Sequence, residues 1–224
     1  MIPRLPVDTA EPLAARFCDA LRAAGFAGDC EGDTGDRAVF ATDNSIYYVP
    51  PAAVVFPRSA ADVVLLAQVA AREPFAALTF APRGGGTGTN GQSLTPGIAV
   101  DLSRHMTRIL AIDPVRRRVR VEAGVVKDQL NAALKPYGLF FAPELSTSNR
   151  ATIGGMISTD ASGQGSCLYG KTHDHVIGLT TVLLDGTVLT AGPCDPAALD
   201  LLRARDDRVG AIHRAVDDIQ RRDG

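Results

Sequence analysis

Five glycines fall within the ten residues 82–91 of this chain, among small polar residues. Glycine has no Cβ, so it accepts positive φ angles and lets the backbone approach a ligand closely. Successive amides of such a loop can line a concave nest for an anion, and Thr87, Thr89 and Asn90 add polar side chains. A glycine-rich turn is the alternative, although a plain hairpin needs only about one or two glycines. The loop therefore predicts a site for a phosphate or pyrophosphate group.

Part of this loop also matches the G-x-G-x-x-G pattern of dinucleotide-binding Rossmann domains, at residues 86–91. In a Rossmann site a helix opens at these glycines, and its amides and dipole face the phosphates. The residues that follow include Pro96 and Gly97 and cannot begin a helix. The sequence therefore argues against a nicotinamide-type Rossmann site.

Another nucleotide-binding pattern, the Walker A motif G-x-x-x-x-G-K-[ST], is matched by residues 165–172. A P-loop follows a hydrophobic strand and precedes a helix. Here residues 159–164 are polar loop and residues 176–184 form a β-branched strand, so the order is reversed. Nucleotide hydrolysis through Lys171 and Thr172 stays an alternative function.

Another polar stretch, rich in Gly, Ser, Thr and Asn, occupies residues 143–171. It is too polar for a core and too long for an ordinary connection, and loops of this kind often carry function. A dinucleotide has a pyrophosphate, two sugars and two ring systems, so it needs contacts from more than one segment. The two polar segments together predict one extended ligand.

The elements that would position the glycine loop form a strand–helix–strand sequence. Residues 53–56 have the continuous apolar pattern of a buried strand, and Ser59 is a helix N-cap before the apolar helix 63–71. Residues 78–81 form a strand that runs directly into the loop, and strand character resumes at residues 98–101. The loop is therefore predicted to join two extended segments.

The remaining elements are read from periodicity and turn residues. An amphipathic helix is expected over 13–26, and residues 28–48 look irregular. The chain then predicts a hairpin at 110–113 and 119–122, a helix at 126–134, and a strand at 176–184 that turns at Asp185 and Gly186 into 188–190. The remainder is predicted to be helical, with an apolar stripe that no later element covers: Val209, Ile212, Val216 and Ile219.

Composition is that of an ordinary globular protein, with 46% hydrophobic and 21% charged residues. The formal net charge of −2 supplies no basic field for nucleic acid. The apolar stretches are far shorter than the ~20 residues that a membrane span needs, and nothing near Met1 resembles a signal peptide. We therefore expect a cytoplasmic protein that has no membrane span and does not bind nucleic acid.

Cysteines and histidines give no sign of a metal site. The four cysteines include no C-x-x-C pair, so neither a zinc site nor a disulfide framework is predicted and all are expected to be free thiols. His173 and His175 would point to opposite faces of a strand and chelate a metal poorly. His105 and His213 lack a base–orienter pattern. No metal ligand and no catalytic residue is predicted.

At this point the motifs resemble the FAD-binding domain of the vanillyl-alcohol oxidase / p-cresol methylhydroxylase (PCMH-type) flavoprotein family. The resemblance covers residues 36–195 and rests on the glycine loop, on 151–155, on 161–163 and on Tyr169 and Gly170 before Val176. It implies an α+β fold of two α/β lobes, about 36–102 and 103–195, with the cofactor between them. A helical lead-in at 1–35 and a helical segment at 196–224 flank this domain.

Residues 141–150 and 159–166 are similar, more narrowly, to the start of large bacterial D-2-hydroxyglutarate dehydrogenases, which carry an iron–sulfur region. This resemblance implies hydride transfer from C2 of a 2-hydroxyacid, of D-2-hydroxyglutarate or D-lactate type, to flavin N5. Family enzymes continue into a cap domain that contributes the substrate pocket, so the chain is expected to be truncated and inactive alone. A non-catalytic interaction fragment, forming homo-oligomers through its C-terminal helix, is another alternative.

The resemblance also assigns the residues that would contact FAD. The loop would hold the pyrophosphate, the segment around 143–155 would border the flavin and ribityl group, and the segment after it would complete the pocket. Covalent family members attach flavin through a histidine of the glycine loop, which is absent here, so non-covalent FAD is expected. The assigned residues are Arg83, Gly84, Gly85, Gly86, Thr87, Gly88, Thr89, Asn90, Gln92, Pro143, Glu144, Ser146, Thr147, Thr152, Gly154, Gly155, Thr159, Ala161, Gly163, Ser166, Tyr169 and Val176.

Overall fold

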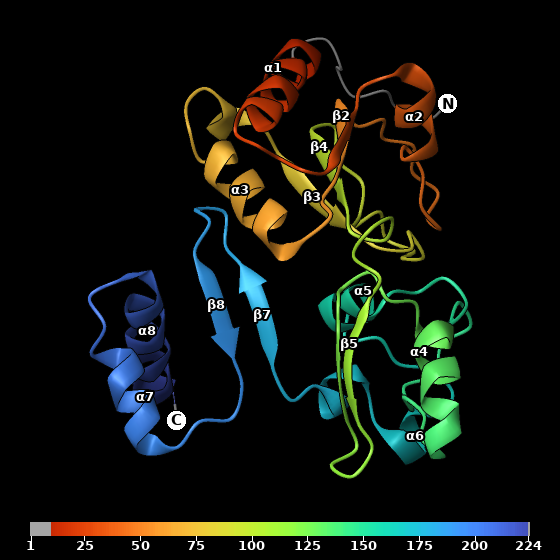
Figure 1. The fold of residues 1–224 in the computed structure, drawn as a ribbon, viewed down its shortest axis with the longest axis vertical. Helices are drawn as coiled ribbons and strands as arrows, with labels where there is room; N and C mark the ends of the chain where they lie inside the picture. Colours follow the sequence, from red (N-terminus) through yellow and green to blue (C-terminus); the bar gives the residue numbers. More distant parts are fainter. Residues whose placement is uncertain (1–9, 224) are drawn as a thin grey trace.

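The computed structural model of the protein describes residues 10–223, so residues 1–9 of the predicted lead-in and Gly224 lie outside it. The chain builds an N-terminal lobe around one sheet, drawn at the top of Figure 1, and then hairpins and helices that lie below it. The fold is α+β, as the sequence predicts. Within the described range, no helix is both long and apolar enough to cross a membrane.

The N-terminal lobe is built on a four-stranded sheet in the order β1-β2-β4-β3. β2 (Ala53–Phe56) and β4 (Ile98–Asp101) are parallel, β3 (Phe80–Arg83) runs parallel to β4, and β1 (Asp29–Glu31) is antiparallel to β2. Every residue of β2 and β4 is buried, which explains their unbroken apolar pattern. The predicted strands on both sides of the glycine loop are confirmed, with β3 starting later than expected.

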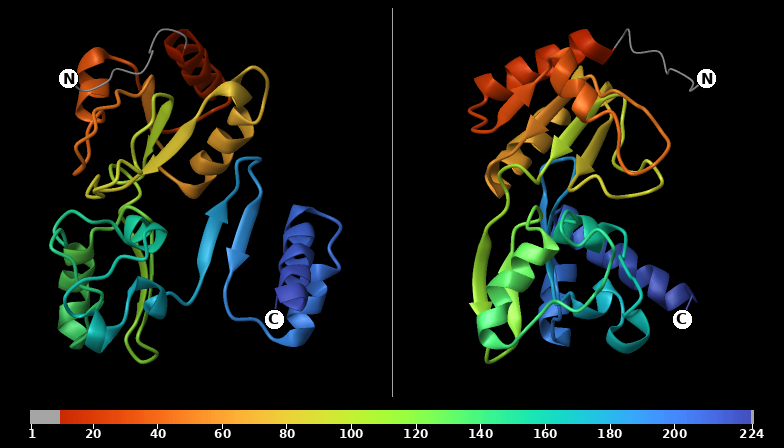
Figure 2. Two further views of the ribbon diagram at one scale, coloured as in Figure 1. Left: turned by 180° about the vertical axis from the view of Figure 1, so that it is seen from behind. Right: turned by 90° about the vertical axis from the view of Figure 1, so that its right-hand side faces the viewer.

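Helices cover this sheet. α1 (Ala10–Ala23) and α3 (Ala60–Ala70) pack over one face with a short 3-10 helix, η1 (Phe75–Ala77), as Figure 2 shows from two further sides. Their core includes Phe17, which is fully buried and meets Phe75 and Phe80 edge to face. Ser59 accepts a hydrogen bond from the Asp62 amide, so the predicted N-cap is confirmed.

The interval 28–48, expected to be irregular, contains β1 and α2 (Thr34–Val39). β1 has no apolar pattern in its sequence. Pairing with β2 and ionic contacts hold it in place. The Asp29 carboxylate accepts hydrogen bonds from His105 Nε2 at 2.6 Å and from Arg58 at 3.1 Å. These contacts are mostly distant in sequence, so local reasoning misses the strand.

The prediction of four free thiols is wrong for two of them. Cys18 of α1 and Cys30 of β1 form a disulfide. The two cysteines are separated by 12 positions without any motif, and only the packing of α1 beside β1 brings them together. Cys167 and Cys194 are free and exposed.

The second lobe begins with the predicted hairpin of β5 (Ile109–Asp113) and β6 (Arg118–Val121), followed by α4 (Lys127–Leu134) and the 3-10 helix η2 (Lys135–Tyr137). The long polar stretch after it is not structureless, because it contains α5 (Ile153–Ser158) and α6 (Ser166–Tyr169). Ile153 and Met156 of α5 are buried against α4, which gives that stretch a small core of its own.

The last part of the chain forms the second hairpin and two helices, shown in blue in Figure 1. His173 to His175 lie in a 3-10 helix, η3 (Thr172–His175), and not in a strand, because the Asp174 carboxylate accepts from the Lys171 amide and closes a turn. The hairpin of β7 (Leu179–Val182) and β8 (Val188–Ala191) follows, then α7 (Pro196–Arg203) and α8 (Arg208–Asp223). On α8, Val209 is buried while Val216 and Ile219 are half exposed.

Candidate cofactor site

The glycine loop connects β3 and β4, which are adjacent parallel strands of one sheet. Gly86 and Gly91 have φ angles of 62° and 71°, in the left-handed region that favours glycine. No helix opens after residue 91, as expected when the Rossmann pattern was rejected. The loop is therefore an irregular crossover whose two ends are fixed by the same sheet.

The amides of this loop are largely free of protein partners. Within residues 10–223, the backbone N–H groups of residues 85–89 donate no hydrogen bond, and that of Asn90 is accepted by Gln92 Oε1 at 3.1 Å. Gln92 folds back over the loop, where a Cβ on Gly88 would collide with its amide group. Accessible amides without internal acceptors are what a nest for an anion requires.

The loop also touches the second lobe at very close range. A Cβ on Gly84 would collide with Thr152 Oγ1, and a Cβ on Gly85 would collide with the Arg150 carbonyl oxygen. Both positions therefore need glycine for close approach and not for an unusual φ. The structure brings two of the predicted segments, 84–90 and 150–155, into direct contact at the junction of the lobes.

Some of the predicted residues in the second segment already use their amides. Thr152 caps α5 by accepting from the Gly155 N–H at 3.3 Å, and the Gly154 N–H is donated to the Ala123 carbonyl at 2.8 Å. The Thr159 hydroxyl donates to the Gly155 carbonyl at 3.0 Å. These bonds shape the segment around α5, whereas residues 85–89 of the glycine loop donate no such bond.

Residues 161–166 pack against residues 143–147, the start of the second polar segment. A Cβ on Gly163 would collide with the Glu144 carbonyl, and one on Gly165 would lie 3.0 Å from Glu144 Oε2. The Ser166 hydroxyl accepts from the Gly163 N–H at 2.9 Å. Residues 143–147 and 161–166 are therefore held side by side, with Pro143 buried and Ser146 exposed.

Comparison with known proteins identifies the family of this chain. A family described as "FAD binding domain" matches residues 51–192. The chain belongs to this FAD-binding domain family. The cofactor of the family is FAD, and the matched range contains the glycine loop and both later segments.

Relatives with assigned names agree. The chain is 60% identical over 200 residues to the D-2-hydroxyglutarate dehydrogenase of Pantoea ananatis. The aligned region covers 89% of this chain and 20% of that protein. The chain is 57% identical over 204 residues to the enzyme of the same name from Escherichia coli, again covering 20% of that protein. The chain thus spans about a fifth of the length of these relatives.

A solved structure of 6-hydroxy-D-nicotine oxidase from Arthrobacter nicotinovorans matches the fold. The TM-score is 0.67 at 23% sequence identity, over 79% of this chain and 38% of that one. At this identity the match concerns the fold alone, and it confirms the predicted PCMH-type architecture.

In the Walker-like segment, residues 165–172, Lys171 and Thr172 contact other parts of the protein. The Asp160 carboxylate accepts from the backbone N–H and Nδ1 of His173, at 3.1 and 2.8 Å, and lies 3.9 Å from Lys171 Nζ. The hydrogen bond from His173 is the main reason why the pKa of Asp160 lies below its ordinary value. Thr172 is fully buried and donates to the Ala161 carbonyl at 2.6 Å. Thr172 thus links Ala161 to η3, and Asp160 joins the same segment to His173.

Two residues that were predicted to contact FAD, Tyr169 and Val176, form their contacts elsewhere in the protein. Tyr169 is partly exposed, meets Phe140 edge to face at 5.6 Å, and its carbonyl accepts from His175. The Val176 N–H is donated to the His173 carbonyl at 3.2 Å. Within the described residues, neither Tyr169 nor Val176 is hydrogen-bonded to the glycine loop.

Sequence reasoning missed two neighbours of the loop and one of the second segment. Arg150 contributes the carbonyl that faces Gly85, and Ala123 accepts from the Gly154 amide of the second segment. Tyr47 would lie 2.8 Å from a Cβ on Gly91. Arg150 lies between two predicted segments and could have been found by contiguity, whereas Ala123 and Tyr47 carry no sequence signal.

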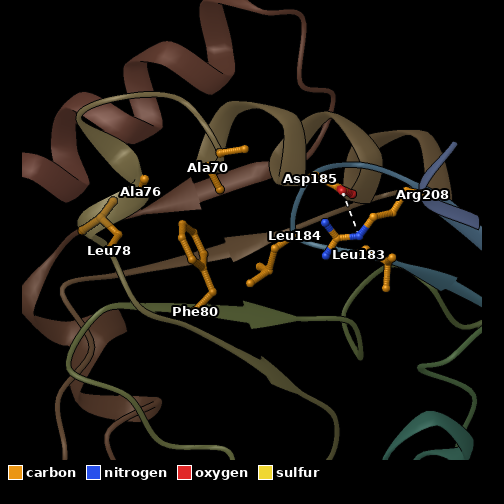
Figure 3. Close-up of a pocket in the computed structure, with 9 residues that line it drawn as sticks. Ala70, Ala76, Leu78, Phe80, Leu183, Leu184, Asp185 and Arg208 are labelled. Carbon is orange, nitrogen blue, oxygen red and sulfur yellow. Dashed lines mark ion pairs between the residues drawn. The ribbon is translucent and has the colours of Figure 1, made fainter. Parts of the chain in front are cut away.

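The lobes meet a second time, far along the chain, where no site residue was predicted. An apolar cavity of about 290 Å³ lies between α3, β3 and the tip of the β7–β8 hairpin, and Figure 3 shows Phe80, Leu78 and Leu184 around it. At its rim Asp185 and Arg208 form an ion pair at 3.8 Å. Most of the residues that line this cavity are apolar.

Proposed function

We propose that this chain is the FAD-binding portion of a flavin-dependent 2-hydroxyacid dehydrogenase of the D-2-hydroxyglutarate type, and that it holds FAD non-covalently. The observation that carries the first part is the set of unused amides at residues 85–89, placed where Gly84 and Gly85 meet the second lobe. The substrate class is supported by the 60% identity to a D-2-hydroxyglutarate dehydrogenase.

The residues present fit the cofactor. The loop offers free N–H groups for a pyrophosphate, and the Gly84 and Gly85 positions leave no room for a Cβ. The segments 143–147 and 161–166 would border the rest of the dinucleotide. No histidine lies between residues 82 and 91, which supports non-covalent binding.

When bound, FAD supplies at flavin N5 the acceptor for the hydride that leaves C2 of the substrate. The role proposed for this chain is to bind and orient the cofactor through backbone amides. No residue in the chain is proposed as the base or as the substrate-carboxylate contact. The cytoplasmic location and the homo-oligomer inferred from the sequence stay predictions.

The cofactor half is tested by adding FAD, FMN or ATP separately to the purified chain and measuring thermal unfolding and the visible absorption of the protein after desalting. We expect FAD alone to raise the unfolding temperature strongly, because a ligand that binds only the native state stabilises it. Acid precipitation should release all flavin into solution. Absence of bound flavin would refute the proposal, and stabilisation by ATP alone would favour the Walker-like alternative.

The substrate half needs a longer protein that carries this domain. Anaerobic addition of D-2-hydroxyglutarate, D-lactate or glycolate should bleach the visible flavin absorption, fastest with D-2-hydroxyglutarate. Bleaching by none of the three would reject the 2-hydroxyacid assignment while leaving FAD binding intact.

A further inference from the structure

The guanidinium of Arg83, at the end of β3, lies beneath the glycine loop. We propose that Arg83 is a positioning residue, which holds the loop in its anion-binding shape and leaves contact with the pyrophosphate to the backbone amides. This inference rests on the proposed binding of FAD at the loop. It replaces a direct cofactor contact with an indirect role for the same side chain.

The first support is where the guanidinium donates its hydrogen bonds. One nitrogen donates to the Phe40 carbonyl at 3.3 Å and the other to the Thr42 carbonyl at 2.7 Å. The guanidinium carbon also lies 5.2 Å from the centre of the Phe40 ring. Two carbonyls and an aromatic face, all from a segment about forty positions earlier, therefore fix the plane of the group.

The second support is the contact between this plane and the loop. A Cβ on Gly86 would lie 2.6 Å from the terminal nitrogen of Arg83 and 3.0 Å from its central carbon. Gly86 is also the loop residue with a φ of 62°. Because the amides of residues 85–89 donate no internal hydrogen bond, the loop depends on such outside contacts for its shape.

The third support is the charge of the group. Burial lowers the pKa of Arg83, although an arginine of this kind stays protonated near neutral pH. The charged groups that influence it are Asp101 and Asp43, which favour its charge, and Arg150, which opposes it. None of the ion pairs among the described residues includes Arg83. A partly desolvated positive charge therefore lies next to the anion site.

Shape and charge can be separated by substitution. Arg83→Lys keeps the charge but has no planar fork, so it cannot donate to both carbonyls and also pack flat beneath Gly86. Arg83→Met keeps the length of the side chain and removes both functions. Arg72→Met is the matched control, because Arg72 is exposed and lies outside this cluster.

The test combines NMR order parameters of the loop amides without FAD and titration of each variant with FAD. We expect lower order parameters over residues 84–91 in both Arg83 variants than in the parent and in Arg72→Met, because the loop loses a fixed contact. The dissociation constant for FAD should rise about tenfold for Arg83→Lys and about a hundredfold for Arg83→Met, in the range for hydrogen bonds to a charged group.

Two results would overturn the inference. Full affinity in Arg83→Lys would mean that charge alone matters, and unchanged order parameters with lost affinity would mean direct contact with the pyrophosphate. If the parent chain binds no FAD, the proposed function fails, while the order parameters still decide whether Arg83 holds the loop.

Circular dichroism and thermal unfolding check that the variants fold, and a second pair guards against a general loss of structure. Gly86→Ala is expected to weaken FAD binding less in the Arg83→Met background than in the parent, because the guanidinium that its Cβ meets is gone. Strict additivity of the two changes would contradict the proposed contact.

Discussion

The two places where the lobes meet are built in different ways. At the glycine loop, Gly84 lies against the Thr152 side chain and Gly85 against the Arg150 backbone, with a row of unused amides beside them. At the β7–β8 tip, apolar side chains surround a cavity and one ion pair closes its rim. The first arrangement leaves polar groups free for a ligand, whereas the second is lined mainly by apolar residues. We therefore expect substitutions at the two contacts to affect different properties.

The largest effect is expected from Gly85→Ala. The added methyl collides with the Arg150 carbonyl, and a backbone atom cannot move aside as a flexible side chain can. Overpacking of this kind costs up to about 3 kcal/mol, so the affinity for FAD should fall by about a hundredfold. Gly32→Ala is the control, because its Cβ would meet nothing within 4 Å. Equal FAD titrations of the two variants would contradict the assigned site.

The next effect concerns the disulfide, which lies remote from both contacts because β1 and β3 occupy opposite edges of the sheet. Reduction, or Cys18→Ser, should lower the free energy of unfolding by about 2–3 kcal/mol and leave FAD affinity unchanged. Cys194→Ser, at an exposed free thiol, should change neither quantity. A loss of FAD affinity on reduction would show that the edge strand and the site are coupled.

A smaller effect is expected at the packing contact. Gly186 has a φ of 84°, and its Cβ would lie 2.5 Å from Cγ of Gln68 on α3. Gly186→Ala should lower the unfolding free energy by about 1–2 kcal/mol without altering FAD affinity. Gly25→Ala is a close match, with a φ of 89° and open space, so the difference between the two variants reports the lobe contact alone. Weaker FAD binding in Gly186→Ala would remove the distinction between the contacts.

The smallest effect is a pH dependence. The pKa of Asp160 is lowered below 3.8, chiefly by the hydrogen bond from His173. A carboxyl whose pKa is lowered in the folded state stabilises that state at pH values above its ordinary pKa. This contribution is lost as the pH falls through the folded pKa. Thermal unfolding of Asp160→Asn should therefore lose a small part of the decline that the parent shows in acid. Identical pH profiles would mean that the Asp160–His173 contact adds nothing.

Sequence patterns were sufficient for elements that are locally determined. The apolar runs of β2 and β4, the Ser59 cap and the Asp185–Gly186 turn each depend on a few neighbouring residues, and each was found. The glycine loop was located by composition, and its role came from resemblance. The family match then confirmed that resemblance.

What could not be predicted depends on partners distant in the chain. β1 exists because β2 and His105 hold it, and the disulfide exists because α1 packs beside it. The 3-10 turn at His173 was read as strand because the β-branched residues after it suggested one, while the deciding contacts come from Asp160 and Asp174. The close contact between Gly84 and Thr152 likewise forms only when the two lobes are assembled.

Neighbouring parallel strands need a crossover of about a dozen residues, which in most proteins is a helix. Between β3 and β4 the glycine loop itself is that crossover. Deletions within it would therefore disturb the pairing of the sheet as well as the anion site, and grafting it elsewhere would require a recipient with the same strand order. In protein engineering this loop should be treated as an inseparable part of its scaffold.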